Sequence, residues 1–402
     1  MKKIFISILI LTVLSINACT SNLTEEAADV LLIIEETEPE IEILIKEITE
    51  ENVIIYDKIE FILENMSIDE KVGQMFFHAF RRDNTGKGIT KINQDIKDII
   101  NNYNIGGVIL FSENIESEQQ VKNYINDLQA ASSLPLFISI DEEGGRVLRT
   151  GALDVPEIES ALSIGNTGDP QNAYNAAKII ANYLSPLGFN MNFAPVADVF
   201  TNPANTVIGD RAFARESSQT AEMVKYFTRG LLDNSVLPTL KHFPGHGDTF
   251  ADSHFGSAVT YKMLSELLDC EFIPFQAGIN AGAPFVMTGH INTPNITGNN
   301  EPALFSSYIL QDILRDMLGF DGIIITDALD MGAVTKYYSP AETAVKAVLA
   351  GVDILLMAAN LEQAYTGMIQ AVESGIITEA RIDQSVKRIL TVKYEAGIIK
   401  GS

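Results

Sequence analysis

From about residue 60 onward, short apolar runs rich in β-branched and aromatic residues alternate with longer stretches in which apolar positions recur at helical spacing. The apolar runs predict strands at 72–77, 107–111, 136–140, 190–194, 236–240, 285–288, 322–326 and 352–357. Several runs, such as Phe137-Ile138-Ser139-Ile140, are apolar almost throughout. This pattern is typical of a parallel sheet that is covered on both faces.

The stretches between the apolar runs predict the helices. They lie at 89–103, 117–130, 170–187, 217–234, 262–281, 306–318, 341–350, 361–374 and 380–394. Helix-start signals such as Asp169-Pro170 and Ser339-Pro340 support these positions. Eight strand–helix units in roughly 340 residues predict an α/β fold, a (β/α)₈ barrel of the TIM type with a single catalytic domain. A doubly wound open sheet is the alternative, but no G-x-G-x-x-G motif follows the first predicted strand.

Polar side chains cluster directly after the predicted strands. They are Asp141 after the third strand, Asp198 after the fourth, Lys241 and His242 after the fifth, His290 after the sixth and Asp327 after the seventh. Barrel enzymes build their sites from several strands at the carboxyl-terminal face. Because polar residues scattered through a core would show no such bias, the pattern favours the barrel over the open sheet.

The chain carries a formal net charge of −25. Residues 20–60 hold 13 acidic and 2 basic side chains, so a net charge of −11 is concentrated there. Non-specific binding to nucleic acid needs a basic surface that releases counterions, so we expect no nucleic-acid partner.

The first residues are typical of an export signal. Lys2 and Lys3 precede the apolar run 4–16, which is too short to span a bilayer. Asn17-Ala18-Cys19 then resembles the lipobox of bacterial lipoproteins, which implies a signal peptide at 1–18 and a lipidated Cys19. A plain secretory signal is the alternative.

The organisation expected after the signal is an acidic tether at 19–57 and a catalytic domain at 58–402. The resemblance to a lipoprotein implies that the protein is exported and attached to the bacterial cell envelope through its lipid anchor, either in the periplasm or at the outer surface.

The most polar segment that follows a predicted strand is Lys241–Thr249 with Asp252-Ser253-His254, which holds three of the five histidines. It is too polar for a core strand and poor in helix formers, so we expect it to form a loop that presents side chains to a ligand. One interpretation is a divalent-cation cluster, which would use His242, His246, Asp248, Asp252 and His254. The spacing differs from the helical His-x-x-x-His of zincins, so we expect no metal and no other cofactor.

Five motifs together resemble those of the family 3 glycoside hydrolases, in their β-N-acetylglucosaminidase branch. They are MSIDEKVGQM at 66–75, DEEGGRV at 141–147, GDRAF at 209–213, the Lys241–His254 segment and TDALDMG at 326–332. The resemblance covers about residues 58–398. It implies hydrolysis of terminal N-acetylglucosamine with retention of configuration, through a covalent glycosyl–enzyme intermediate.

The resemblance also implies the catalytic residues. Asp327, directly after the seventh strand, corresponds to the family's nucleophile. The alternative is that Asp327 only caps a helix. His254 corresponds to the general acid/base, oriented and kept basic by Asp252. An imidazole suits this role because its ordinary pKa lies near ~6.5, where a proton can be both donated and accepted.

The substrate contacts implied by motif position are Asp141, Arg149, Arg211, Lys241 and His242. A carboxylate can accept hydrogen bonds from sugar hydroxyls, while Lys, Arg and His can donate them. Arg149 could instead form an ion pair with Glu142 or Glu143. The family often has Gln at position 142, and we expect the change to Glu to be tolerated.

The expected partner is a carbohydrate, either an N-acetylglucosaminide or a cell-wall muropeptide. A lipoprotein that binds glycan without turnover is a second interpretation, yet Asp327, Asp252 and His254 are all present in the sequence. A β-glucosidase or β-xylosidase of the same family is a third, although those enzymes typically draw their acid from a second domain.

Overall fold

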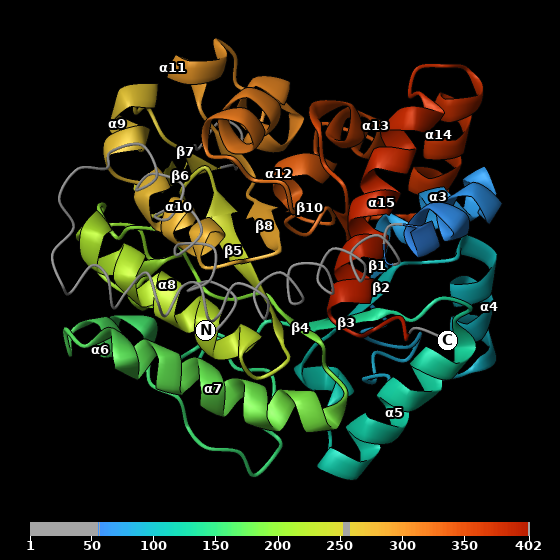
Figure 1. The fold of residues 1–402 in the computed structure, drawn as a ribbon, viewed down its shortest axis with the longest axis horizontal. Coiled ribbons are helices and arrows are strands. Elements are labelled where there is room, and N and C mark those ends of the chain that lie inside the picture. Colours follow the sequence, from blue (N-terminus) through green and yellow to red (C-terminus); the bar gives the residue numbers. More distant parts are fainter. Residues whose placement is uncertain (1–54, 56, 252–257, 401–402) are drawn as a thin grey trace, which may run out of the picture. The chain divides into compact units, whose positions relative to one another are not determined.

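The structure is a computed structural model that describes residues 55, 57–251 and 258–400. The chain divides into two compact units, 1–58 and 59–402, and nearly all described residues belong to the second. In this second unit, strands lie at the centre and helices surround them (Figure 1). The expected signal peptide, Cys19 and nearly all of the expected tether lie outside the described residues.

Among the described residues, one eight-stranded sheet forms the centre, and its strands follow one another around the sheet in chain order. They are β1 (Phe76–His78), β2 (Gly107–Leu110), β3 (Phe137–Ile140), β4 (Met191–Asn192), β5 (Leu237–Phe243), β8 (Phe285–Thr288), β10 (Ile323–Thr326) and β11 (Leu355–Leu356). Neighbouring strands run parallel. A parallel bridge between Ile325 and Ile354 joins the two ends of the sheet. The expected (β/α)₈ barrel is therefore confirmed, and the doubly wound alternative is wrong because its strand order would reverse in the middle.

Helices cover the outside of the barrel. Those between or after the strands are α3 (Ile68–Gln74), α4 (Gln94–Tyr103), α5 (Glu118–Ala131), α7 (Pro170–Leu187), α8 (Ser217–Leu232), α10 (Phe272–Asn280), the π-helix η4 (Tyr308–Met317), α13 (Pro340–Ala350), α14 (Leu361–Glu373) and α15 (Glu379–Glu395). Side-chain oxygens of Ser117, Asp169, Ser339 and Thr378 accept backbone N–H groups where α5, α7, α13 and α15 begin. These caps satisfy donors that would otherwise lack partners in the first turn. None of the helices formed by the described residues has both the length and the apolar character needed to cross a membrane.

The core lies inside the barrel and between its strands and helices. All four residues of β2, β3, β8 and β10 are buried, which explains their nearly continuous apolar sequence. Phe193, Phe200 and Phe243 also belong to this core. Cys270, by contrast, is half-buried rather than fully buried.

Some predicted boundaries are wrong for identifiable reasons. Residues 72–74, predicted as strand, end α3, because Ser67 and Glu70 form a capping box that starts a helix just before them. The predicted helix 262–281 is divided at Cys270, whose backbone (φ −137°, ψ −77°) separates α9 (Leu264–Asp269) from α10. Lys241 and His242 belong to the last residues of β5 rather than to a loop.

A second, three-stranded sheet was not predicted. It consists of β6 (Phe250–Ala251), β7 (Ala258–Val259) and β9 (Ile291–Asn292). Strands of two residues are too short to produce a detectable alternation in the sequence. The antiparallel pair β6–β7 flanks residues 252–257, and β7 pairs in parallel with β9, which begins directly after His290.

The amino-terminal end of the barrel is held by charges around Asp353, which is fully buried. Its carboxylate accepts hydrogen bonds from Arg315 (2.6 Å), Arg388 (3.1 Å) and Ser385 (2.6 Å). Arg381 lies 3.7 Å from the same carboxylate. Such a buried carboxylate is tolerable only because these partners replace the water it has lost.

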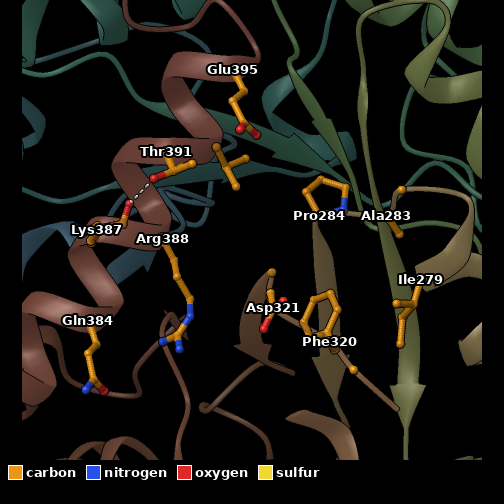
Figure 2. Close-up of a pocket in the computed structure, with 14 residues that line it drawn as sticks. Ile279, Ala283, Pro284, Phe320, Asp321, Gln384, Lys387, Arg388, Thr391 and Glu395 are labelled. Carbon is orange, nitrogen blue, oxygen red and sulfur yellow. Dashed lines mark hydrogen bonds between the residues drawn. The ribbon is translucent and has the colours of Figure 1, made fainter. Parts of the chain in front are cut away.

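A groove of about 600 Å³ opens beside this cluster, between α15 and the residues that lead into β8 and β10 (Figure 2). Arg388 extends from α15 into the groove, and Pro284, Phe320 and Asp321 form the opposite side (Figure 2). Pro284 and Gly322 directly precede β8 and β10. The groove therefore lies at the opposite end of the barrel from the polar residues that follow the strands.

Lys393 on α15 is fully buried, and its ammonium donates to Gln74 Oε1 (2.8 Å). Its Nζ also lies 5.2 Å from the ring centroid of Phe137, the first residue of β3. Burial lowers the pKa of Lys393 to about 7. In the unfolded chain this lysine keeps its proton up to about pH 10.4, so between these values the unfolded state binds more protons and folding stability rises with pH.

Substituting Lys393→Met should remove this contribution. We expect the melting temperature of the wild-type protein, relative to that of the variant, to rise between pH 7 and pH 10. Thermal unfolding across this range measures the effect, and Lys336→Met, at an exposed lysine, is the matched control. If the melting temperatures of the wild type and of Lys393→Met differ by the same amount at every pH in this range, the lowered pKa of Lys393 is contradicted.

Candidate active site

Asp327 is the first residue beyond β10, and the barrel ladder fixes its backbone. Its N–H donates to the carbonyl of Thr288 in β8 (2.9 Å), and its Oδ1 accepts the N–H of Ala328 (2.7 Å). The carboxylate lines a cleft of about 470 Å³ together with His246 and His290. The end of the seventh barrel strand therefore places a carboxylate in the lining of the cleft.

The surroundings of Asp327 favour its ionised form. Burial alone would raise the pKa of this carboxyl group. The charges of His290 and His242, the N–H of Ala328 and the charge of Lys241 outweigh burial and hold the pKa below its usual range. A carboxylate that stays ionised can act as a nucleophile.

Lys241, in β5, is the centre of a buried charge network, and its side chain is 2% exposed. Its ammonium lies 2.8 Å from Asp141 Oδ1 and 2.7 Å from Glu143 Oε1. Burial lowers the pKa of Lys241, but the two carboxylates outweigh burial and raise it. Because an ammonium has three N–H groups, one remains for another acceptor.

Arg211 extends the network from the loop that follows β4. Its guanidinium forms a bidentate pair with Glu143, with Nε–Oε2 and Nη2–Oε1 distances of 2.8 Å. Burial would raise the pKa of Glu143, but Lys241 and Arg211 outweigh it and lower that pKa to about 2. Glu143 is therefore the carboxylate that holds two predicted substrate-binding cations in place.

His242 is held by Asp198, which is fully buried. His242 donates from Nδ1 to Asp198 Oδ2 (2.8 Å), and Asp198 Oδ1 accepts the backbone N–H groups of His242 (3.2 Å) and His246 (2.6 Å). The Nε2 atom of His242 then lies 3.5 Å from Arg211 Nη2. The imidazole is thus oriented through both ring nitrogens.

Arg149 lies at the edge of this network, with Nη2 3.6 Å from Asp141 Oδ2. Its Nε atom is buried and has no hydrogen-bond partner within the described part of the chain. The expected alternative, pairing with Glu142 or Glu143, is wrong, because Glu143 binds Arg211 and Lys241. Glu142 is fully buried and accepts from Tyr183 (2.8 Å), the Thr150 hydroxyl (2.5 Å) and the Arg149 N–H (2.7 Å).

Burial raises the pKa of Glu142. Glu142 accepts hydrogen bonds from four donors, two of which are backbone N–H groups. The amide of a Gln side chain could also fit among these donors. That the exchange of Gln for Glu at this position is tolerated stays a prediction.

His290 and His246 both face the catalytic cleft. His290 is 6% exposed, donates from Nε2 to the carbonyl of Ala328 (2.8 Å), and has a buried Nδ1 without a partner among the described residues. His246 has Nδ1 2.8 Å from the Thr249 hydroxyl, and burial together with the charge of His242 lowers its pKa. His246 lines the cleft as well.

Asp252 and His254, the predicted acid/base pair, lie outside the described residues. The structure does describe both ends of the segment that contains them. Asp248 accepts from Thr260 (3.0 Å) and Thr201 (3.3 Å), and lies 3.6 Å from Lys262. These contacts join the chain before the segment to the chain after it, close to the cleft.

The structure brings Asp141, Arg149, Arg211, Lys241 and His242 together, and they are organised by two carboxylates to which the sequence assigned no role, Glu143 and Asp198. The sequence placed Asp198 after the fourth predicted strand, but that position alone does not reveal that it binds His242. Glu143 lies in the same motif as Asp141. Its role depends on which guanidinium reaches it from 68 residues away, which no local pattern reveals.

Within residues 55, 57–251 and 258–400, no group of three or more His, Cys, Asp or Glu side chains is arranged to hold a metal ion. His242 and His246 lie close together, with ring centroids 5.6 Å apart, but the Nδ1 of each already faces a protein partner. What the site offers is a carboxylate beside several hydrogen-bond donors, which suits displacement at a carbon that develops positive charge.

Known proteins resemble this chain over most of its length. The glycosyl hydrolase family 3 N-terminal domain model matches residues 67–392. Beta-hexosaminidase A of Pseudoalteromonas piscicida is 34% identical over 333 residues, which cover 76% of this chain and 56% of that relative. Beta-hexosaminidase LpqI of Mycobacterium tuberculosis is 33% identical over 308 residues, covering 74% of this chain and 78% of that relative.

A solved structure shows the same architecture. The glycoside hydrolase family 3 beta-N-acetylglucosaminidase from Paenibacillus sp. str. FPU-7 superposes with a TM-score of 0.79 at 37% identity, covering 84% of this chain and 64% of that one. The family match, residues 67–392, includes Lys241 in β5 as well as Asp141 and Asp327, which directly follow β3 and β10. With its barrel, its charge network and the extent of the family match, this chain belongs to glycosyl hydrolase family 3.

Proposed function

We propose that this protein is a retaining β-N-acetylhexosaminidase that removes terminal non-reducing N-acetyl-D-glucosamine from peptidoglycan fragments or related β-glycosides. The observation that carries the proposal is the position of Asp327, an ionised carboxylate on the floor of the cleft beside the charge network of Lys241. The relatives named beta-hexosaminidase support the choice of sugar.

In the first step, a carboxylate oxygen of Asp327 forms a bond with the anomeric carbon, and the bond from that carbon to the leaving oxygen breaks. His254 donates a proton to the leaving oxygen. In the second step, His254 removes a proton from water, the water oxygen attacks the anomeric carbon, and the ester bond to Asp327 breaks. Asp252 would orient His254 and favour its charged form.

The sugar would be held by the groups around Lys241. Asp141 can accept hydrogen bonds from sugar hydroxyls, and the third N–H of Lys241 can donate one. The side chain of Arg149 is 28% exposed, so its guanidinium can also donate to the substrate. His242 and Arg211 would complete the contacts, with Asp198 and Glu143 fixing their positions.

Three alternatives can be tested with the same assay. Turnover of a chromogenic N-acetylglucosaminide separates an enzyme from a lipoprotein that only binds glycan. A higher kcat/KM for the matching glucoside would favour a β-glucosidase. Loss of turnover in the presence of a chelator, restored by zinc, would favour the metal-dependent interpretation.

Asp327→Asn should lower kcat by roughly 10⁴-fold or more, because the amide keeps the acceptor for the Ala328 N–H but is not nucleophilic. In the wild-type protein, mass spectrometry after reaction with a 5-fluoro N-acetylglucosaminyl fluoride, which keeps the 2-acetamido group, should find the sugar on Asp327.

Asp330→Asn is the matched control, because this nearby aspartate does not line the cleft. An adduct on another residue, or equal losses in the two variants, would contradict the role of Asp327.

His254→Ala should slow hydrolysis most for substrates with poor leaving groups, by about 10²–10⁴-fold, because such groups need a proton as they depart. Aryl glycosides with leaving groups of graded acidity measure the effect. A loss that is the same for every leaving group would argue against the acid role.

We also propose that the protein is exported and attached to the cell envelope through a lipid on Cys19, as the resemblance of residues 17–19 to a lipobox indicates. Cys19→Ala should leave hydrolytic activity unchanged while moving the protein from the membrane fraction to the soluble fraction. Labelling of cells with a radioactive or alkyne fatty acid should mark the wild-type protein and not the variant; labelling of both would contradict the site.

A further inference from the structure

Glu142 is a buried ionisable residue that takes no part in the proposed mechanism. It lies in the chain between Asp141 and Glu143, whose carboxylates both contact the ammonium of Lys241. The side chain of Glu142 has other partners, among them Tyr183 of the outer helix α7, whose hydroxyl donates to Oε1 (2.8 Å). Because Glu142 is 0% exposed, it cannot touch a substrate directly. Any effect of Glu142 on the substrate must therefore pass through another residue.

The carboxylate of Glu142 closes a loop of the chain. Its Oε2 accepts the backbone N–H groups of Arg149 (2.7 Å) and Thr150 (3.3 Å), and its Oε1 accepts the Thr150 hydroxyl (2.5 Å). Backbone N–H groups that are buried without an acceptor cost free energy, so the chain at residues 149 and 150 stays where these oxygens are. The side chain of Glu142 thus determines the path of the backbone at Arg149.

The backbone of Glu142 is itself fixed by a neighbouring strand. Asn192 in β4 accepts the N–H of Glu142 at Oδ1 (3.0 Å) and donates from Nδ2 to the carbonyl of Glu142 (2.8 Å). On either side of Glu142, the contacts with Lys241 hold the adjacent carboxylates. The four hydrogen bonds of the Glu142 side chain therefore connect a rigid part of the barrel to the loop that ends at Arg149.

Arg149 is the residue whose position depends on this connection. Its guanidinium lies 3.6 Å from Asp141 Oδ2 and 5.6 Å from the ring centroid of Phe111, which directly follows β2. The side chain of Arg149 is partly exposed, so it can meet a ligand. An arginine side chain has many rotamers, and a group that is already held in its binding position loses less entropy when a ligand arrives.

We propose that Glu142 is a positioning residue, which holds Arg149 beside Asp141 so that these two side chains are ready to bind the terminal sugar. The inference rests on the proposed function and deepens it, because it names a residue that controls affinity for the sugar without touching it. The two N–H groups need an acceptor but no negative charge. The hydroxyls of Thr150 and Tyr183 can bond to an amide as well as to a carboxylate.

Two substitutions separate the reach of the Glu142 side chain from its charge. Glu142→Asp keeps the charge but is one methylene group shorter, so its oxygens leave the N–H groups of the loop. We expect it to raise both KM for a chromogenic N-acetylglucosaminide and Kd for N-acetylglucosamine by about fivefold or more, with a smaller change in kcat. Glu142→Gln keeps the reach and should leave all three values within about twofold of the wild type.

Steady-state kinetics and titration calorimetry provide these values. An unchanged KM and Kd in Glu142→Asp would overturn the proposal. Glu142→Gln with the larger loss would also overturn it, because charge rather than reach would then be what the site needs.

A double-mutant cycle tests whether the effect passes through Arg149. Arg149→Met removes the guanidinium that Glu142 is proposed to position. In this background, Glu142→Asp should raise Kd for N-acetylglucosamine no further, because nothing remains at residue 149 to be held beside Asp141. If the two substitutions have independent effects on Kd, Glu142 does not act through Arg149 and the proposal fails.

Ser385→Ala is the matched control for a general loss of stability. Ser385 is fully buried at the opposite end of the barrel, where its hydroxyl donates to Asp353 (2.6 Å). This variant should lower the melting temperature without changing KM or Kd. If it raises KM as much as Glu142→Asp does, destabilisation accounts for both results and no positioning role is left for Glu142.

The wild-type protein separates this proposal from the proposed function. If the chromogenic N-acetylglucosaminide is not hydrolysed and N-acetylglucosamine does not bind, the proposed function fails and the role of Glu142 fails with it. If the substrate is hydrolysed with the same KM by the wild type and by Glu142→Asp, the proposed function holds and only the role of Glu142 fails.

Discussion

The buried ammonium of Lys241 is the interaction on which the site depends. A lone charge in this position would be strongly unfavourable, because it has lost its water. Asp141 and Glu143 compensate at 2.8 and 2.7 Å, and Arg211 balances the second carboxylate. Lys241 and Arg211 thus face Asp141 and Glu143, and Arg149 approaches Asp141 at the edge of the group. If one member is removed, an unpaired charge remains buried, so the four residues form a single unit.

This unit also influences the neighbouring carboxylate. Lys241 and His242 help to keep Asp327 ionised against the effect of burial. The orientation of His242 depends in turn on Asp198, which comes from the segment after β4. Groups from β3, β4, β5 and β10 are therefore connected electrostatically. The parallel barrel makes this possible because it brings the carboxyl ends of all its strands to one face.

The two ends of the barrel differ in what their charges do. At the carboxyl end, several groups remain available to a ligand, such as the third N–H of Lys241 and the half-buried guanidinium of Arg149. At the amino end, Asp353 is enclosed by arginines that also donate to backbone carbonyls, as Arg315 does to Phe320 and Gly322. Similar residue types therefore stabilise the fold at one end and bind substrate, as we propose, at the other.

The fold was largely predictable because a parallel barrel produces continuous apolar strands and regularly capped helices. Strand β10 and helix α7 begin and end within a residue of their predicted limits. The prediction failed where strands are too short to show a period and where a local cap outweighs an apolar run. The two-residue strands β6, β7 and β9 leave no periodic signal, and the capping box at Ser67 overrides the apolar run that follows it.

In the site, too, some residues could be placed from local sequence and others could not. Residues that end strands, such as Asp141 and Asp327, could be placed from local pattern alone. Glu143 and Asp198 could not be given roles in this way, because their partners lie 68 and 44 residues away in the chain.

The small sheet of β6, β7 and β9 suggests how such enzymes can diversify. Asp327 is built into the barrel, whereas the stretch with the proposed acid is attached through a hairpin held by a few backbone pairs. A graft or exchange of that hairpin would leave the barrel ladder untouched. The nucleophile and the proton donor that we propose therefore depend on separate parts of the fold, so a change in the hairpin need not disturb Asp327.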